Sequence, residues 1–176
     1  MKSLLTPKQL KYGSFLDPVT GDPIDFPYVK TRHLKGERKL WFVKIPWYEL
    51  LEDVVYADPM GRIWRAPGRV VDEEGKIVKW GMIFNGGSVP WWLWWLCPPN
   101  HPDAFGAFVI HDYLCDEEYR DSTRERRREY EPYDVSSEEV TKIFRWAMGA
   151  NGYYPFGSWR NKVGVGWFGP RFKAKA

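Results

Sequence analysis

Hydrophobic positions recur at helical spacing in two segments of the second half of the chain. The first segment covers residues 103–116, and the second follows a capping box formed by Ser136 and Glu139. Both patterns predict amphipathic helices that bury one face. The residues expected on these buried faces are Ala104, Ala107, Phe108, His111, Leu114 and Cys115 in the first helix, and Val140, Ile143, Phe144 and Ala147 in the second.

Residues 38–84 contain short apolar runs separated by turn sequences. Asp58-Pro59-Met60-Gly61 and Asp72-Glu73-Glu74-Gly75 both predict turns, because proline presets one turn dihedral and glycine accepts a positive φ. Short strands between such turns predict an antiparallel meander.

Glycines are expected to end the helical part. Gly149 and Asn151-Gly152 should stop the second helix, and a third, glycine-weakened helix is expected from Ser158. With a β meander followed by two to three C-terminal helices, the predicted fold class is α+β.

The first 37 residues differ from the rest of the chain. They are rich in proline, glycine and aspartate and show no sustained period, which predicts an extended N-terminal arm over residues 1–37. Scattered aromatic residues are expected to hold this arm: Tyr12, Phe15, Phe26 and Tyr28. Residues 117–135 are highly charged and indicate a solvated insertion or a short exposed helix. No internal repeat is present, so residues 38–176 are expected to form a single α+β domain.

The composition limits the classes of protein that fit. The chain has 176 residues, enough for one domain with a core. Aromatic residues make up 18% of it, and tryptophan and tyrosine favour packed interiors and contact surfaces. The net charge of +3 is too small to imply nucleic-acid binding by itself. No apolar run approaches the roughly 20 residues of a membrane span.

The two cysteines, Cys97 and Cys115, do not suggest a disulfide framework. The opening residues contain no apolar run typical of a secretory signal. We therefore expect both thiols to be reduced and buried in a protein made in the cytosol.

His111 and Asp112 form the most specific chemical pattern. A histidine can take a proton from water near neutral pH, and an aspartate can bind a hard cation such as calcium. The alternative is structural: a histidine on an apolar helix face is usually a hydrogen-bonded core residue. Cys115 is four residues from His111 and could approach it on the helix, but both are expected on the buried face.

The segment before this helix contains a glycine-rich loop and a cluster of tryptophans. Asn85, Gly86, Gly87 and Ser88 could bring backbone carbonyls close to a ligand, and we expect this loop to pack against His111 and Asp112. The tryptophans from Trp91 to Trp95 are expected mainly to cover the core. A surface for a partner chain is the second interpretation, and contact with a membrane interface is the third and is not favoured.

An arginine-rich stretch offers a further alternative. Residues 124–128 contain four arginines, and the C-terminal tail adds more basic residues, so phosphate binding is conceivable. Glu125 and Glu129 dilute the stretch, and a solvated face explains it better. Nucleic acid is therefore an unlikely partner.

Three motifs together resemble the phage and prophage domain-of-unknown-function family numbered 1353. They are "FNGGSVP", "AFVIHDYLC" and "EEVTKIFRWAMGANG". Carried over by position, Gly86, Gly87, Ser88 and Pro90 match the first motif. His111, Asp112, Tyr113 and Leu114 match the second, which makes Tyr113 a candidate binding residue, and Phe144 and Met148 match the third. The resemblance covers about residues 38–168.

This chain departs from the family pattern at three positions. Asn85 stands where the family usually has aspartate, Cys115 where it has tyrosine, and Lys142 where the last helix usually has aspartate. Two acidic positions are therefore neutral or basic, so any chemistry of that acidic cluster is in doubt in this chain.

The His-Asp helix is also similar to the catalytic helix of phospholipases A2. That likeness implies His111 as the base, Asp112 as a calcium ligand and the carbonyls of Asn85, Gly86 and Gly87 as further ligands. The disulfides of the secreted enzymes are absent, and Lys142 stands where a second aspartate would orient the histidine.

We therefore expect a phage-encoded structural or accessory protein, located in the virion or the host cytoplasm, whose His-Asp motif is mainly structural. Its partners would be other phage proteins or a host protein, and no cofactor is expected. The alternative is a calcium-assisted hydrolase of esters or phospholipids that uses His111 as its base.

Overall fold

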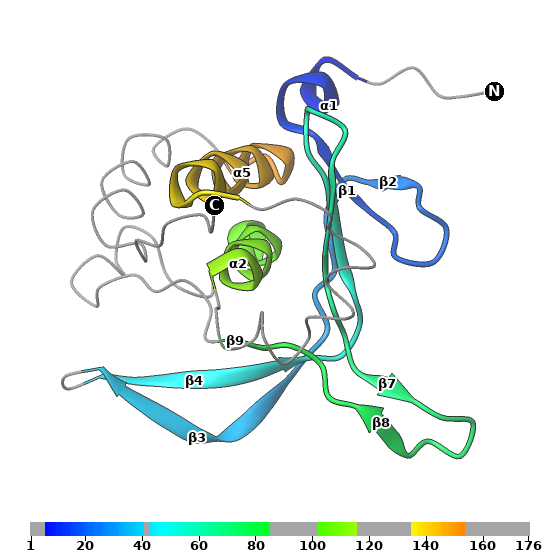
Figure 1. Ribbon diagram of the computed structural model, residues 1–176, viewed down its shortest axis with the longest axis vertical. Helices are drawn as coiled ribbons and strands as arrows, with labels where there is room; N and C mark the ends of the chain where they lie inside the picture. The colour runs from blue at the N-terminus through cyan, green and yellow to red at the C-terminus, as the bar shows by residue number, and fades with distance from the viewer. Residues whose placement is uncertain (1–5, 41–42, 85–101, 116–134, 154–176) are drawn as a thin grey trace.

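The computed structural model describes residues 6–40, 43–84, 102–115 and 135–153. Antiparallel strands dominate the first half of this part of the chain, and the two longer helices follow them (Figure 1). The predicted α+β fold class is confirmed. The third helix expected from Ser158 lies outside the described residues, as does the charged stretch before residue 135.

Nine short strands form three antiparallel sheets in the described residues. The strands are β1 (Ser14–Leu16), β2 (Pro23–Ile24), β3 (Thr31–Leu40), β4 (Val43–Leu50), β5 (Val54–Ala57), β6 (Ile63–Ala66), β7 (Val70–Val71), β8 (Ile77–Lys79) and β9 (Ile83–Phe84). One sheet has the order β2-β1-β5-β6, another has the order β3-β4-β9, and β7 pairs with β8. The predicted antiparallel strands are thus divided among three sheets.

Both predicted turns are present and have the same hydrogen bonds. In the β5–β6 turn, the amide of Gly61 donates to the carbonyl of Asp58 at 2.9 Å, and in the β7–β8 turn Gly75 donates to Asp72 at 3.0 Å. Both glycines have φ near +80°, which a residue with a side chain rarely adopts. The turn chemistry of the sequence therefore fixed these two hairpins.

The segment predicted as an extended arm contains regular structure. Helix α1 (Pro7–Tyr12) begins with a capping box at Thr6, and β1 pairs with both β2 and β5. Phe15 is buried in the core, whereas Phe26 and Tyr28 are exposed. A Cβ atom at Gly106 would lie only 3.2 Å from the Phe15 ring, so that glycine lets this segment approach the central helix.

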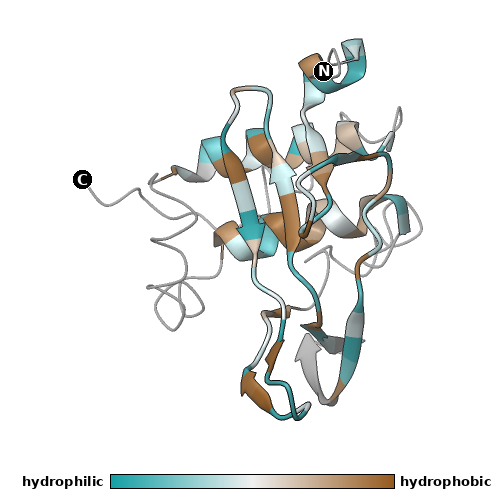
Figure 2. Cartoon of the chain, turned by 90° about the vertical axis from the view of Figure 1, so that its right-hand side faces the viewer, coloured by the Kyte–Doolittle hydropathy of each residue, from teal (hydrophilic) through white to brown (hydrophobic). Residues whose placement is uncertain are grey.

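Helix α2 (Pro102–Cys115) lies in the corner between the two larger sheets, and helix α5 (Ser137–Ala150) packs alongside it (Figure 1). Hydrophobic residues of the strands and helices meet in this corner, and others occupy the β7–β8 hairpin that stands away from it (Figure 2). Of the helices in the described part of the chain, none is long and apolar enough to cross a lipid bilayer.

Helix α5 confirms most of its predicted pattern. The Ser136 hydroxyl accepts a hydrogen bond from the amide of Glu139 at 3.2 Å, and the expected stripe from Val140 to Ala147 is buried. Gly149 does not stop the helix, which ends at Ala150. A Cβ atom at Gly149 would lie 2.4 Å from the Tyr12 ring, so this glycine makes room for helix α1 rather than ending α5.

Candidate functional site

The candidate site is built on α2, which is buried on nearly all sides. The predicted face is buried except for Cys115, which is partly buried, and Val109, Ile110 and Tyr113, which fall outside that face, are buried as well. An amphipathic helix covers one layer, whereas α2 is enclosed by two sheets and by α5 and is therefore apolar all round. Tyr113, a predicted binding residue, is part of the hydrophobic core.

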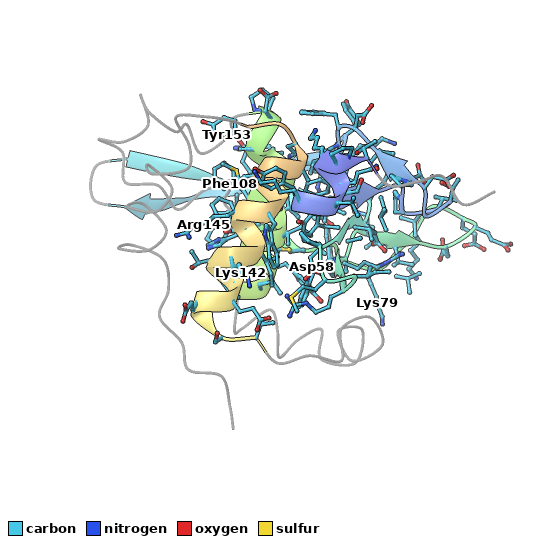
Figure 3. The ribbon with its side chains drawn as sticks, turned by 90° about the horizontal axis from the view of Figure 1, so that it is seen from above. Asp58, Lys79, Phe108, Lys142, Arg145 and Tyr153 are labelled. Carbon is cyan, nitrogen blue, oxygen red and sulfur yellow. The ribbon has the colours of Figure 1, made fainter. Side chains whose placement is uncertain are left out.

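His111 lies inside this core, on the side of α2 that faces α5. The residue is 8% exposed, and its ring centroid is 4.9 Å from that of Phe144 with a tilt of 58°. Phe144 also packs on Phe108, which Figure 3 places between the two helices. The expectation that His111 occupies the apolar helix face is confirmed.

Two polar side chains from the same helix lie beside the imidazole. The Nδ1 atom of His111 is 3.4 Å from Oδ1 of Asp112, and its Nε2 atom is 3.5 Å from Sγ of Cys115. The same sulfur is 3.9 Å from Nδ1. A sulfur that is almost equally far from both ring nitrogens cannot lie along the N–H direction of either, so its hydrogen bond to the ring is weak.

These neighbours decide the charge of the imidazole. Burial by itself disfavours the charged ring, but the adjacent Asp112 carboxylate, with a contribution from the Cys115 sulfur, raises the pKa of His111 to about 10. The raised pKa favours the protonated imidazolium, whose Nδ1 would donate toward Asp112. A protonated ring cannot accept a proton, so in this state His111 is not a general base.

The other residues that the sequence singled out for a site or a surface lie outside the described residues. These are Asn85, Gly86, Gly87 and Ser88, together with the tryptophans from Trp91 to Trp95 and the basic stretch at 124–128. The expected contact between the glycine-rich loop and α2 therefore stays a prediction. Within the described ranges, no group of three or more histidine, cysteine, aspartate or glutamate side chains is placed to hold a metal ion.

Lys142 does not approach the histidine in the way an orienting aspartate would. Its Nζ atom lies over the Trp146 ring, 4.8 Å from the centroid, and its side chain is on the exposed side of α5 (Figure 3). In the described residues, the polar contacts of the imidazole come from α2 itself.

A second polar cluster, which the sequence did not predict, joins the β5–β6 hairpin to α5. The Asp58 carboxylate accepts hydrogen bonds from Nε of Arg62 at 2.7 Å and from Nε1 of Trp64 at 3.1 Å. The Arg62 guanidinium also pairs with Glu139, the residue expected to complete the capping box. Figure 3 shows Asp58 beside α5. The i, i+4 spacing of Asp58 and Arg62 in a turn is the only sequence signal for this cluster.

A third cluster lies on the outer face of the β3-β4-β9 sheet. The Glu49 carboxylate is fully buried and is bound by Arg69, at 3.0 and 2.5 Å, and by Arg32, at 2.8 Å. The guanidinium carbons of these two arginines lie 5.0 Å (Arg32) and 5.5 Å (Arg69) from the ring centroid of Trp80. No sequence signal marks this cluster, because its members come from four separate segments.

Comparison with known proteins gives one match. The model of a family described as "Protein of unknown function (DUF1353)" matches residues 48–165, which include α2 and α5. No curated protein and no solved structure matches the chain.

Proposed function

The chain belongs to the DUF1353 family, proteins of unknown function, and from this premise we propose that it is a phage-encoded structural or accessory protein associated with the virion. In this proposal the His111-Asp112 motif mainly holds the fold together. The phage setting comes from the resemblance of the three sequence motifs, and the structural role of the motif comes from its geometry.

The observation that carries the structural role is the burial of His111. A catalytic base must come within about 3 Å of the proton that it removes. The imidazole is instead packed on Phe144 inside the core and is held as a cation by its helix neighbours. Such a group stabilises the contact between α2 and α5 and is poorly placed to meet a substrate.

The exposed apolar residues support a role in binding other proteins. Large side chains that are well exposed include Tyr28, Met60, Val78 and Trp80. Aromatic residues of this kind are enriched at protein interfaces because they bury much area with few rotatable bonds.

Quantitative mass spectrometry of purified virions tests the proposal. We expect the chain in particles at a fixed copy number relative to the major capsid protein. Its absence from particles, together with abundance in infected cells, would overturn the virion role. A tagged copy should then recover a host protein, as expected for an inhibitor acting in the host cytoplasm.

A His111→Ala variant tests the structural role of the motif. Removing the ring leaves its partly buried partners Asp112 and Cys115 without their contact and opens a cavity against Phe144, which should cost roughly 1–3 kcal/mol of unfolding free energy plus a cavity contribution. Met60→Ala, at an exposed turn position, is the control and should unfold like the parent. A His111→Ala protein that is as stable as the parent would contradict this role.

A calcium-assisted ester or phospholipid hydrolase is the second candidate. One observation favours it: Asp112 and Cys115 are only partly buried, so a polar pair beside His111 reaches the end of α2. Asp112 would hold the calcium ion, and His111 would act as the base after losing its proton. Calorimetry with calcium is decisive, because the absence of binding up to millimolar concentration leaves Asp112 without a metal and excludes this mechanism.

A further inference from the structure

Trp80 is an exposed indole that two arginines hold in place. It follows β8 directly and is 57% exposed. The guanidinium groups of Arg32 and Arg69 lie against its ring, and contacts of this kind between a cation and a ring restrict the rotamers of both side chains.

Both arginines are in turn fixed by one buried anion. Glu49 is fully buried, and its two carboxylate oxygens accept hydrogen bonds from Arg69. Oε2 also forms an ion pair with Nη2 of Arg32 at 2.8 Å, and the amide of Gly81 donates to Oε1 at 3.3 Å. Charge-assisted hydrogen bonds to a buried carboxylate are among the stronger polar contacts in proteins. The indole therefore rests on a rigid base, although it is itself in solvent.

The backbone that follows Trp80 is pinned as well. The amide of Leu50 donates to the carbonyl of Met82 at 2.8 Å, and the amide of Met82 donates to the carbonyl of Pro67 at 2.9 Å. A Cβ atom at Gly81 would lie 1.8 Å from the carbonyl oxygen of Leu50, so the two segments approach as closely as a glycine permits. The position of the indole is thus set before any partner arrives.

The surroundings of Trp80 are partly apolar and carry positive charge. Ile83 is exposed and lies on the same sheet face as Arg32, because the strand register pairs Arg32 with Glu49 and Glu49 with Ile83. Val78, two residues before Trp80, is also exposed. Lys79 points away from α5 into solvent (Figure 3). Two cations, Arg32 and Arg69, stand against one buried anion, Glu49, which leaves one net positive charge at this cluster.

We propose that Trp80, Ile83, Val78 and Arg32 form a docking surface for an acidic protein partner, with Trp80 as its anchor. The proposal rests on the proposed role as an accessory protein and names the chemistry of the partner. A carboxylate of the partner would complement Arg32, and an apolar or aromatic side chain would cover Trp80 and Ile83. The aliphatic neighbours favour a protein over a nucleic acid, whose bases stack on aromatic rings along a backbone-binding groove.

The pre-ordered indole makes the anchor effective. Binding loses free energy when side chains at an interface become immobilised, about 0.5–1.5 kcal/mol for each flexible one. Arg32 is paired with Glu49, and the Trp80 ring lies against Arg32 and Arg69, so their contacts with a partner carry a smaller entropy loss. Rigid tryptophans and arginines are also the residue types most often found at the energetic centre of interfaces.

Binding of a random copolymer of glutamate and tyrosine to the purified chain tests the proposal. Calorimetry should show binding to the parent, and the Kd should rise at least about tenfold in Trp80→Ala, as for an interface anchor. Arg32→Gln should weaken binding less, since Arg69 still supports the ring. Met60→Ala is the matched control, an exposed apolar truncation in the β5–β6 turn, and should bind like the parent. Denaturant unfolding of each variant verifies that it is folded.

Four outcomes would overturn the proposal. The first is that the folded parent does not bind the copolymer, and the second is that the parent and Trp80→Ala bind it equally well. The third is that the chain binds an oligothymidylate more tightly than the copolymer and that this binding depends on Trp80. The fourth is self-association in sedimentation velocity that depends on Trp80. The third would assign the surface to single-stranded nucleic acid, and the fourth to a second copy of the chain. Because the assay uses the purified chain, its failure leaves the mass spectrometry of virions unaffected, and absence from virions leaves the binding result unaffected.

Discussion

Trp64 and Trp80 each lie against an arginine guanidinium that is bound to a buried carboxylate, yet one indole is in the core and the other is in solvent. Trp64 is 0% exposed and Trp80 is 57% exposed. The Arg62 guanidinium carbon is 5.0 Å from the Trp64 ring centroid, the same distance as Arg32 from Trp80. Both regions therefore combine a buried carboxylate, an arginine and an indole, but one places the indole in the core and the other places it at the surface.

The difference lies in what the indole nitrogen and the second charge do. Trp64 donates its N–H to Asp58, and Arg62 pairs with Glu139 of α5. These contacts join the β5–β6 hairpin to α5. At Glu49, both bound cations come from the outer side of the sheet. A buried carboxylate thus makes its arginines rigid in both regions. The first region uses that rigidity to join a hairpin to a helix, and the second uses it to hold an indole at the surface.

The largest contrast is expected from removing each indole. Trp64→Ala should lower the free energy of unfolding by about 4 kcal/mol, because it opens a large cavity in the core and removes a donor to Asp58. Trp80→Ala should lower it by at most about 1 kcal/mol, the value of exposed cation–ring contacts. Urea unfolding of both variants measures the contrast. Similar losses in the two variants would mean that Trp80 is a structural residue.

The next largest effect is expected at Asp58. Its carboxylate binds Arg62 and Trp64 and also caps its own turn, where the amides of Met60 and Arg62 donate at 2.8 and 3.0 Å. Asp58→Ala leaves a nearly buried guanidinium without its main partner and should lower the free energy of unfolding by about 3 kcal/mol.

The β7–β8 turn provides the matched control for that experiment. Asp72 makes the same two turn hydrogen bonds, to the amides of Glu74 at 3.1 Å and Lys76 at 2.7 Å, but it is exposed. Asp72→Ala should therefore lower the free energy of unfolding by only about 1 kcal/mol. If the two variants unfold alike, the turn itself, and not the buried ion pair, accounts for the effect of Asp58.

Glu49→Gln tests the rigid base of the exposed indole. The amide keeps the shape but loses the charge that holds two guanidinium groups, and we expect a loss of about 2 kcal/mol at pH 7. Although burial opposes its charge, the hydrogen bonds from Arg69 and Gly81 and the nearby charges keep the pKa of Glu49 below its usual 4.5. Its stabilisation is therefore present above pH 4.5 and is lost as the pH falls through the folded-state value.

Unfolding curves from pH 7 down to pH 3 should thus bring the parent and Glu49→Gln together. The parent loses the ionised carboxylate on acidification, whereas the variant has none to lose. Parallel curves over the whole range would show that the charge of Glu49 does not stabilise the fold.

The smallest effect is expected at His111. Here the buried charge is a cation beside a carboxylate, whereas Glu49 is an anion between two cations. Because the pKa is raised from 6.5 to about 10, the folded state binds a proton that the unfolded state releases in that range. Stability from this group is complete below pH 6.5 and declines as the pH rises toward 10. His111→Gln should be about 1 kcal/mol less stable than the parent at pH 7. The difference should shrink on the alkaline side, and a difference that does not change with pH would contradict a buried imidazolium.

The periodic features of the sequence predicted the two longer helices and the two hairpin turns of this fold. The apolar spacing gave α2 and α5 almost to the residue, and the Asp-x-x-Gly patterns gave both hairpin turns, because these signals are local. Asn151-Gly152 ends α5 as predicted, with Asn151 as the C-cap and Gly152 at positive φ. Gly149 was wrongly expected to stop the helix, since its missing side chain makes room for Tyr12.

The clusters of the candidate sites were harder to predict, for a physical reason. Arg32, Glu49, Arg69 and Trp80 are brought together by sheet register and loop packing, neither of which leaves a spacing in the sequence. His111, Asp112 and Cys115 were visible because one helix carries all three. The sequence could suggest their proximity, but the charge of the imidazole depends on its burial, which only the packing of α5 shows.

The contact between Tyr12 and Gly149 also has a consequence for synthesis on the ribosome. Helix α1 leaves the exit tunnel before α5, on which it packs. Until then, Tyr12 and neighbouring apolar residues have no helix to cover them, and contacts over such sequence separations form slowly. The contact between α1 and α5 therefore cannot form on the ribosome until α5 has emerged.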